Sequence, residues 1–242
     1  NCPSIKSLKI YIDDINDPLK IGVEENYQIF VDDRGAFLFS STLWGSLHGL
    51  ESLSQLIYFD PRSESYLVKK TCIYDEPAYD FRGFLIDTSR HYLPIDLIFK
   101  HIDAMRSVKL NVLHWHIVDN EAFPYVSQMY PRFYQCGSNN PRTHVYTTSD
   151  IEKVTKYALD RGIIVMLEID TPSHVNSWYG VEEILVNCSD NSYLIDPSKN
   201  ISFTVVRNLM KEIHKITKSP YIHIGGDEVD GECWYYNMNI QV

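Results

Sequence analysis

The 242-residue sequence lacks a long apolar run, an excess of basic residues and a dense set of cysteines. No run approaches the roughly 18 apolar residues of a membrane-spanning helix, so we expect no membrane span. Its 22 lysines and arginines stand against 32 aspartates and glutamates, a formal net charge of −10. A net-acidic surface without a basic stripe argues against nucleic acid as a partner. With 44% hydrophobic residues, the chain has the apolar content of a globular protein.

The five cysteines are too few for a disulfide scaffold and lack the C-x-x-C spacing of a zinc site. Their odd number leaves at least one thiol unpaired or paired outside this sequence. Asn187-Cys188-Ser189 and Asn200-Ile201-Ser202 match the acceptor motif for N-linked glycosylation, which favours secretion without establishing it. The first residues, Asn1-Cys2-Pro3, are typical of a chain interior, so we expect that a leader has been left out.

Residues 1–78 have the pattern of a small α+β domain. Residues 8–12 and 27–31 alternate apolar and polar side chains with the period of a strand. Leucines then recur at helical spacing over 43–57, after a Ser41-Thr42 pair suited to cap a helix. No group of residues here carries recognisable chemistry, and we expect a structural domain.

From residue 79 the pattern changes to alternating strands and helices, which predicts a parallel α/β architecture. Ser149 is expected to cap one helix, with Glu152 completing a capping box. Strand patterns cover 84–87, 110–117, 163–169 and 221–224, and helical patterns cover 95–107, 149–159 and 203–216.

Each predicted strand ends in a cluster of polar residues. The carboxyl ends of parallel strands form the functional site of α/β folds, so we expect these clusters to meet. A complete (β/α)₈ barrel takes about 250 residues, at roughly 30 or more per βα unit. The sheet is therefore either small and open or the first half of such a barrel. The clusters are Asp87-Thr88-Ser89-Arg90, His114-Trp115-His116 with Asp119, Glu168-Ile169-Asp170 with His174, and Asp227-Glu228.

The last cluster follows two glycines, in Gly225-Gly226-Asp227-Glu228. Glycines let the chain leave a strand with unusual dihedral angles, so adjacent carboxylates need not point to opposite faces. Neighbouring carboxylates also repel each other, which favours protonation of one of them, as a general acid requires.

The spacing His114-x-His116 places two imidazoles on one strand face and leaves two interpretations open. With His174 and Asp227 they could bind a metal ion in a barrel metallohydrolase, although such enzymes carry the pair on the first barrel strand. Alternatively, Asp119 and His174 belong to a hydrogen-bonded set that holds a catalytic carboxylate.

Arg90 could donate from its planar guanidinium to vicinal hydroxyls or a carboxylate of a substrate, or form a salt bridge with Asp87. Four aromatic residues close to the clusters are expected in the core rather than against a ligand. They are Trp115, Phe123, Tyr125 and Trp178.

Four segments resemble successive barrel strands of glycoside hydrolase family 20, the β-N-acetylhexosaminidases, and most closely its eukaryotic lysosomal branch. The resemblance runs in order from about Thr42 to Trp234. The segments are RGFLIDTSRHYLP at 82–94, NVLHWHIVD at 111–119, EIDTPSH at 168–174 and HIGGDEV at 223–229.

The resemblance implies a TIM-barrel catalytic domain, with 79–242 as its first half, preceded by the family's small α+β domain at 1–78. It implies an exo-acting hydrolase that removes terminal β-linked GlcNAc or GalNAc from glycans with retention of configuration. The substrate's acetamido oxygen is then the nucleophile, and neither a metal nor an organic cofactor is needed. The alternative is a truncated, non-catalytic homologue that binds glycan or pairs with a full subunit.

Carried over by position, the resemblance assigns Glu228 as the general acid and base. Asp227 would orient the acetamido group and stabilise the oxazolinium ion. Asp119 and His174 would form a hydrogen-bonded relay that tunes the proton affinity of Glu228, with His116 in support.

Arg90 would bind hydroxyls of the terminal sugar. Two positions depart from the family pattern: Ser173 stands where glycine is usual, and Asn120-Glu121 follows Asp119 where other residues are common. The family's tryptophans and tyrosine around the sugar come from later strands, which would follow Val242.

Cys188 and Cys233 match positions that form a disulfide in this family, and Asn200 falls near a family glycosylation site. With the second sequon at Asn187, the resemblance implies a lysosomal or secreted protein. It also implies a homo- or heterodimer of the full-length protein, and it does not distinguish GlcNAc from GalNAc.

Overall fold

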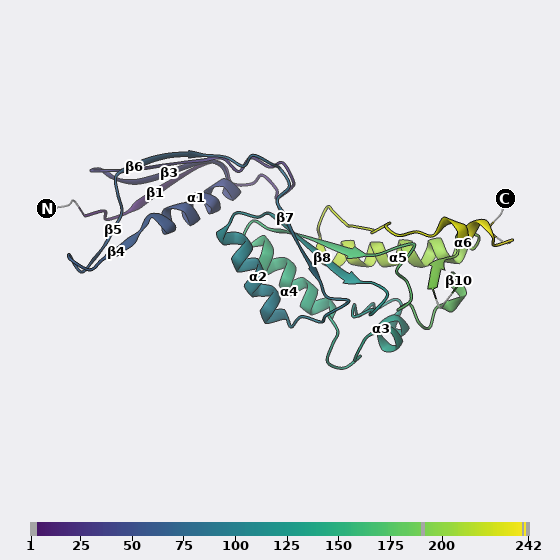
Figure 1. The fold of residues 1–242 in the computed structure, drawn as a ribbon. Coiled ribbons are helices and arrows are strands. Elements are labelled where there is room, and N and C mark those ends of the chain that lie inside the picture. The colour runs from purple at the N-terminus through teal and green to yellow at the C-terminus, as the bar shows by residue number, and fades with distance from the viewer. Residues whose placement is uncertain (1–3, 190–191, 239, 241–242) are drawn as a thin grey trace. The chain divides into compact units, whose positions relative to one another are not determined.

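The computed structural model describes residues 4–189, 192–238 and 240 (Figure 1). The described residues form two compact units. One contains the residues up to Arg82 together with Ile102–Asn111 and Leu159–Ile163. The other contains Gly83–His101, Val112–Ala158 and the residues from Ile164 onward. The domain boundary between residues 78 and 79 stays a prediction.

The first unit is built on a four-stranded sheet with the order β1-β3-β2-β6. Strands β2 and β3 form an antiparallel hairpin, β6 is antiparallel to β2, and β1 is parallel to β3. A separate antiparallel hairpin pairs β4 with β5. The strands are β1 (Leu8–Asp14), β2 (Tyr27–Asp32), β3 (Gly35–Thr42), β4 (Tyr58–Asp60), β5 (Ser65–Leu67) and β6 (Thr71–Asp75).

Helix α1 (Leu43–Leu56) packs on one face of this sheet, where Ile29 and Leu38 are buried. Thr42 caps the helix as predicted, since its side-chain oxygen accepts from the Gly45 amide at 3.3 Å. A Cβ on Gly49 would lie 2.3 Å from Cδ1 of Leu38, so only glycine lets the helix approach the sheet this closely.

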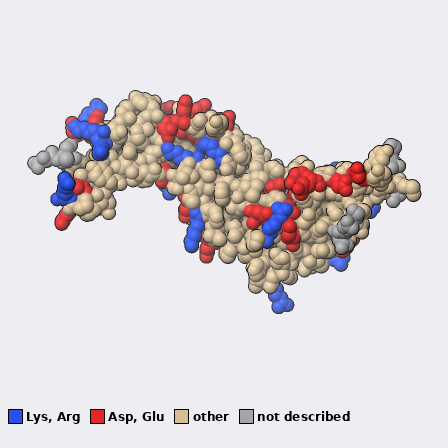
Figure 2. All heavy atoms as spheres, viewed as in Figure 1, with Lys and Arg blue, Asp and Glu red and all other residues tan. Residues whose placement is uncertain are grey.

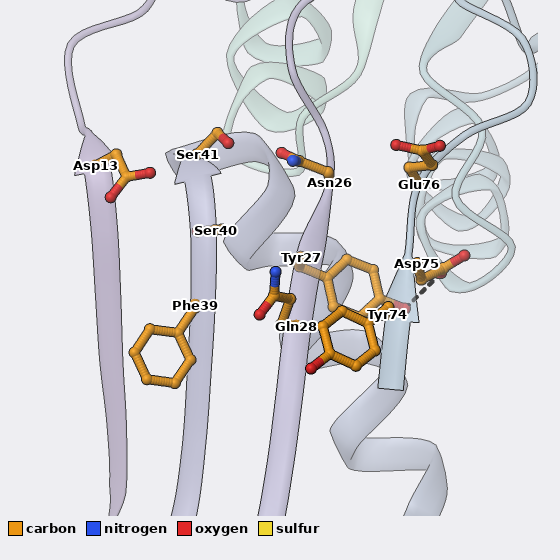
Figure 3. Close-up of a pocket in the computed structure, with 10 residues that line it drawn as sticks. All are labelled: Asp13, Asn26, Tyr27, Gln28, Phe39, Ser40, Ser41, Tyr74, Asp75 and Glu76. Atoms are coloured by element: carbon orange, nitrogen blue, oxygen red, sulfur yellow. Dashed lines mark hydrogen bonds between the residues drawn. The ribbon is translucent and has the colours of Figure 1, made fainter. Parts of the chain in front are cut away.

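A pocket of about 360 Å³ lies at one end of this sheet (Figure 3). The hydroxyl of Tyr27 donates to Asp75 Oδ2 at 2.5 Å in its wall. Asp75 also pairs with Lys109 Nζ at 2.8 Å. None of the residues to which the sequence motifs assign chemistry lines this pocket, so the candidate site lies in the second unit.

The second unit contains a parallel sheet with the order β7-β8-β9. Helices α2 and α4 follow β7 and β8 along the chain and lie side by side, with Phe99 stacked on Tyr157 at 4.2 Å. Helix α5 follows β9. This alternation confirms the predicted parallel α/β fold class. The bounds are β7 (Gly83–Asp87), α2 (Ile95–Ser107), β8 (Val112–Val118), α4 (Thr148–Leu159), β9 (Ile164–Ile169) and α5 (Asn200–Thr217).

Shorter elements fill the loops of this unit. Strands β10 and β11 form an antiparallel hairpin. A disulfide with a Cα–Cα distance of 5.0 Å joins Cys188 on β10 to Cys233 on α6, the pair that the resemblance implied. Cys72 and Cys136 are not disulfide-bonded, and Cys2 lies outside the described residues. The elements are α3 (Pro131–Gly137), the 3₁₀ turn η1 (Glu182–Ile184), β10 (Leu185–Ser189), β11 (Ser192–Ile195) and α6 (Gly231–Tyr235).

Two expectations about local structure are wrong in detail. The segment 221–224 is not a regular strand, because His223 forms only an isolated parallel bridge with Glu168. Helix α4 begins at Thr148, and its start is closed by Thr147 and Asp150 rather than by Ser149 and Glu152. The Asp150 amide donates to Thr147 Oγ1 at 3.2 Å while Asp150 Oδ2 accepts from the Thr147 amide at 3.0 Å.

The aromatic residues that the sequence placed in the core are all buried there, from Trp115 on β8 to Trp178. Phe123 and Tyr125 lie between them in sequence and are buried as well. In the described part of the chain, no helix has the length and apolar character needed to cross a membrane.

Candidate active site

The register of the parallel sheet aligns the polar clusters in one row. Asp87 pairs with His116, His116 with Glu168, and Glu168 with His223. Paired residues on adjacent strands point to the same face of a sheet, so these four side chains converge at its carboxyl edge. They line a cavity of about 370 Å³, which also contains Arg90, His114, Asp119 and Asp227.

The turn after His223 explains why two glycines precede the carboxylate pair. Gly225 and Gly226 both have positive φ angles, 70° and 106°. A Cβ on Gly225 would lie 1.6 Å from Asp170 Oδ1, the atom that accepts from the Gly226 amide at 3.1 Å. Glycine is therefore required where the turn crosses the buried Asp170 carboxylate.

This turn leaves both carboxylates of the pair open to solvent. The side chain of Asp227 is 66% exposed and that of Glu228 is 79% exposed. Glu228 has a φ of 49°, in the left-handed region that non-glycine residues seldom adopt. Non-glycine residues held in this region cluster at functional sites.

His174 connects Glu228 to the buried interior. Its Nε2 lies 3.0 Å from Glu228 Oε2, and its Nδ1 lies 2.5 Å from Asp170 Oδ2 and 3.5 Å from Asp119 Oδ2. Burial by itself lowers the pKa of His174, but the hydrogen bond to Asp170 and the charge of Asp119 outweigh it and raise the pKa. The imidazolium form therefore donates to carboxylates from both ring nitrogens.

The hydrogen bonds of His174 run to Glu228 and Asp170, whereas Asp119, which the family resemblance placed in the relay, lies only within ion-pair distance. The role of this set as a relay stays a prediction. The sequence could have indicated Asp170 as a partner of His174, because Asp170 follows β9 directly and stands four residues before His174. Burial raises the pKa of Asp170, while His174 and the Gly226 amide oppose that rise.

His116 bridges two carboxylates below the cavity. Its Nε2 lies 2.7 Å from Asp119 Oδ2 and its Nδ1 lies 2.8 Å from Glu168 Oε2. Burial alone lowers the pKa of His116, but the two carboxylates more than compensate and raise the pKa to about 10. The charged ring fixes Asp119, whose own pKa is lowered by His116, the Asn120 amide and nearby cations against the effect of burial.

Glu168 is a second residue that the site assignment left out. Its carboxylate accepts from His114, from His116 and from His223 Nδ1, the last at 2.9 Å. Burial alone raises the pKa of Glu168, but these imidazoles hold it well below its ordinary value. The sequence signal for this cluster was a glutamate near the end of one predicted strand, next to a strand that carries the His114-x-His116 pair.

Arg90 lies among three carboxylates. Its Nη1 lies 2.8 Å from Asp87 Oδ2, its Nη2 lies 2.9 Å from Asp119 Oδ1, and its Nε lies 2.7 Å from Glu121 Oε2. Burial lowers the pKa of Arg90, but these neighbours raise it overall and keep the guanidinium charged. The salt bridge between Arg90 and Asp87, the alternative that the sequence left open, is therefore present, and Nη1 of Arg90 also lies 3.4 Å from His116 Nε2.

Two family models match the sequence. The model "Glycosyl hydrolase family 20, catalytic domain" matches residues 79–242, and the model "beta-acetyl hexosaminidase like" matches residues 1–56. The chain belongs to glycosyl hydrolase family 20.

Relatives in this family include the beta-hexosaminidase subunit alpha of Bos taurus. It is 43% identical over 228 residues, which are 91% of this chain and 43% of the relative. The human beta-hexosaminidase subunit beta is 41% identical, over 91% of this chain and 41% of its own length. The chain thus spans less than half the length of these relatives.

Solved structures of the family have the same fold. The chitobiase of Flavobacterium johnsoniae superposes with a TM-score of 0.87 at 30% identity, over 96% of this chain and 36% of its own. The N-acetyl-beta-hexosaminidase of Streptomyces plicatus gives 0.77 at 25% identity, over 91% and 47%. The parallel strands of this chain are accordingly barrel strands of a family 20 catalytic domain.

A metal site would require several histidine and carboxylate side chains with their ligand atoms close together. The four residues considered for it, His114, His116, His174 and Asp227, do not form a single group in the described part of the chain. Three other groups of ligand atoms lie close together, among them His114, Glu168 and His223. In this group both imidazoles contact the Glu168 carboxylate directly, which favours the hydrogen-bonded interpretation of the site.

Proposed function

We propose that this chain contributes the catalytic carboxylates of an exo-acting β-N-acetylhexosaminidase. Its substrates would be glycans ending in β-linked GlcNAc or GalNAc. The observation that carries the proposal is the exposed Glu228 carboxylate next to Asp227, which lines the cavity; Glu228 is held by an imidazole that is itself anchored on a buried acid. Family membership and the names of the relatives support the reaction class.

Glu228 is the proposed general acid and base. His174 Nε2–H donates to Oε2 of Glu228, which fixes the carboxyl group and leaves Oε1 to carry the proton. That proton passes to the glycosidic oxygen as its bond to the anomeric carbon breaks. In the second half of the reaction, Glu228 removes a proton from the attacking water.

Asp227 is proposed to act on the acetamido group of the substrate. The acetamido oxygen attacks the anomeric carbon as the leaving group departs, forming a cyclic oxazolinium ion that water then opens with retention. A carboxylate beside the acetamido nitrogen orients that group and stabilises the positive charge as it develops. Asp227 is the exposed acid next to Glu228, and its Oδ1 lies 3.9 Å from His174 Nδ1.

Arg90 is proposed to bind hydroxyls of the terminal sugar. A guanidinium offers five N–H groups, and three of those of Arg90 donate to Asp87, Asp119 and Glu121. Nη1 also lies 3.4 Å from His116 Nε2, so one N–H on Nη2 remains for a sugar hydroxyl. His116 supports this arrangement because it holds Asp119, which in turn holds Nη2.

The test uses two chromogenic substrates that differ only in the acetamido group. The natural full-length protein should release nitrophenol from nitrophenyl β-GlcNAc and at least ~10² more slowly from nitrophenyl β-glucoside, which lacks the internal nucleophile. Equal rates would contradict the substrate-assisted mechanism. Binding of GlcNAc without release from either substrate would instead favour a non-catalytic glycan-binding homologue.

The compartment and assembly are proposals as well. A lysosomal or secreted location is supported by the disulfide between Cys188 and Cys233 and by two exposed sequon asparagines, Asn187 and Asn200. We further propose a homo- or heterodimer of the full-length protein, since relatives are named as alpha and beta subunits.

A further inference from the structure

The sheet of the first unit carries a row of aromatic side chains on the face opposite α1. Side chains alternate between the two faces of a strand, and the residues next to Gln28 and Phe39 are buried ones of β2 and β3. The register aligns Tyr11 with Phe39, Phe39 with Gln28, and Gln28 with Tyr74. Three rings and one amide therefore form a single row across four neighbouring strands, which we call the aromatic row.

The rings of the aromatic row are open to solvent and contact other rings on the same face. Tyr11 is 49% exposed, Phe39 is 38% exposed and Tyr74 is 65% exposed. Tyr11 stacks on Phe39 with the ring centroids 4.9 Å apart. Phe30 packs edge-on against Phe39 and Tyr74, at 5.9 and 5.7 Å. Such contacts between rings are favourable and hold them in place, and an exposed apolar patch with a polar rim is typical of a binding surface.

The pocket of about 360 Å³ lies along this row (Figure 3). Phe39 and Tyr74 lie on either side of the exposed Gln28 side chain, each on a strand next to β2. Because neighbouring strands are about 4.8 Å apart, the backbones that carry the two rings are separated by roughly 10 Å. A disaccharide is long enough to contact both rings while it lies over Gln28.

The polar groups of the pocket indicate the charge and chemistry of its ligand. Gln28 offers a neutral amide with two N–H donors and a carbonyl acceptor. Asp13 and Glu76 are exposed acids at one end of the pocket, and none of the described residues that line it is a lysine or an arginine. Figure 2 shows acidic side chains in red gathered over the part of the first unit where β6 ends in Figure 1. This acidic rim disfavours anions and accepts hydrogen bonds from neutral donors.

An N-acetylhexosamine matches each of these features. The C–H groups on the face of its ring and its acetamido methyl group can pack on Phe39 and Tyr74. Its acetamido N–H and carbonyl complement the amide of Gln28, and its hydroxyls can donate to Asp13 and Glu76. A second copy of this chain fits less well, because the acidic rims of two copies would repel each other.

We propose that the aromatic row is a second glycan-binding site, which takes a neutral oligosaccharide of β-linked N-acetylhexosamines and does not cleave it. The pocket along the row shares no residue with the cavity that contains Asp227, and all of its lining residues belong to the first unit. The site goes beyond the proposed catalytic activity and does not depend on Glu228. It should strengthen binding of long glycans and leave hydrolysis of a single sugar unchanged.

The test titrates chitotetraose, a neutral tetramer of β-linked GlcNAc, into the full-length protein by calorimetry. The protein carries Glu228→Gln so that the probe is not consumed. We expect two binding events per chain, and adding Tyr74→Ala should weaken one of them at least ~10-fold, because it removes buried apolar area and a stacking contact. Tyr66→Ala is the matched control, since Tyr66 is an exposed tyrosine of the same unit outside the pocket, and it should leave both events unchanged.

Three results would overturn the second site. They are a single binding event that Tyr74→Ala does not change, two events that both persist in Tyr74→Ala, and equal weakening by Tyr74→Ala and Tyr66→Ala. Equally tight binding of cellotetraose, which lacks the acetamido groups, would overturn the proposed choice of ligand. Hydrolysis of nitrophenyl β-GlcNAc by Tyr74→Ala with Glu228 intact should match the wild type. Failure of the wild type to cleave that substrate would count against the proposed function alone.

Discussion

Replacing Asp170 by asparagine tests the buried end of the chain of contacts that reaches Glu228. Asp170 accepts from His174 Nδ1 at 2.5 Å through Oδ2 and from the Gly226 amide at 3.1 Å through Oδ1. An asparagine keeps the shape and can keep the Oδ1 contact. It removes the negative charge that holds His174 in its imidazolium form.

The magnitude follows from the hydrogen bond that is lost. Bonds to a charged partner contribute about 1.5–3 kcal/mol, and each 1.36 kcal/mol corresponds to a tenfold change in rate. We therefore expect Asp170→Asn to lower kcat by about 10- to 150-fold, with a smaller change in KM because Asp170 is buried. Steady-state kinetics with nitrophenyl β-GlcNAc between pH 4 and 8 measure both parameters.

The pH profile separates this role from simple loss of packing. His174 has a raised pKa in the wild type, so its protonated form persists above the ordinary histidine value of about 6.5. In Asp170→Asn that pKa should fall, and the alkaline limb of kcat should move to lower pH. Asp196→Asn is the matched control, since Asp196 is buried and pairs with Lys199 at 3.1 Å without touching His174. A drop in kcat without a shift of the alkaline limb, or an equal drop in kcat in the control, would contradict the role of Asp170 in keeping His174 protonated.

Three further predictions concern the surrounding structure. The free energy of unfolding should fall by up to a few kcal/mol as the pH rises from about 6.5 to about 10, because folded His116 keeps its proton up to a pKa of about 10. Urea titrations of the wild type and His116→Gln at pH 6 and 9 measure this fall. The same pH dependence in both proteins would contradict the prediction. Cys188→Ser removes the disulfide between residues 45 apart in sequence and should lower the free energy of unfolding by at most about 4 kcal/mol, seen as a lower Tm. An unchanged Tm under non-reducing conditions would count against the disulfide. Gly225→Ala should reduce the rate of nitrophenyl β-GlcNAc hydrolysis at least ~10-fold, because the new Cβ would lie 1.6 Å from Asp170 Oδ1. Gly231→Ala is the control and should keep its activity, because a Cβ there meets open space. Equal activities of the two variants would contradict the role of the turn.

Much of this site was predictable because the carboxyl ends of parallel strands lie at the same edge of a sheet. Once 84–87, 110–117 and 163–169 are recognised as strands of one parallel sheet, the polar residues after each must meet at one edge. The register then places Asp87, His116 and Glu168 in a row. Helix α2 was predicted with its observed bounds, Ile95–Ser107, from the apolar residues along one of its faces.

The remainder depends on side-chain placement that sequence spacing does not encode. Both Asp119 and Asp170 lie within reach of His174 Nδ1, at 3.5 and 2.5 Å, and the spacing of these residues in the sequence does not decide between them. The contact between Glu121 and Arg90 joins loops 31 residues apart. The cap of α4 was misplaced because Thr147 and Ser149 are both good cap residues, and only the backbone decides between them.

The role of Glu228 as proton donor is tested by how the effect of Glu228→Gln depends on the leaving group. A general acid matters most when the leaving group is a poor one, such as the sugar of a β-linked GlcNAc disaccharide, and least for dinitrophenolate. We expect Glu228→Gln to slow disaccharide hydrolysis at least ~10² while slowing release of dinitrophenolate far less. An equal loss on both substrates, or full activity on the disaccharide, would contradict the assignment of Glu228 as the proton donor.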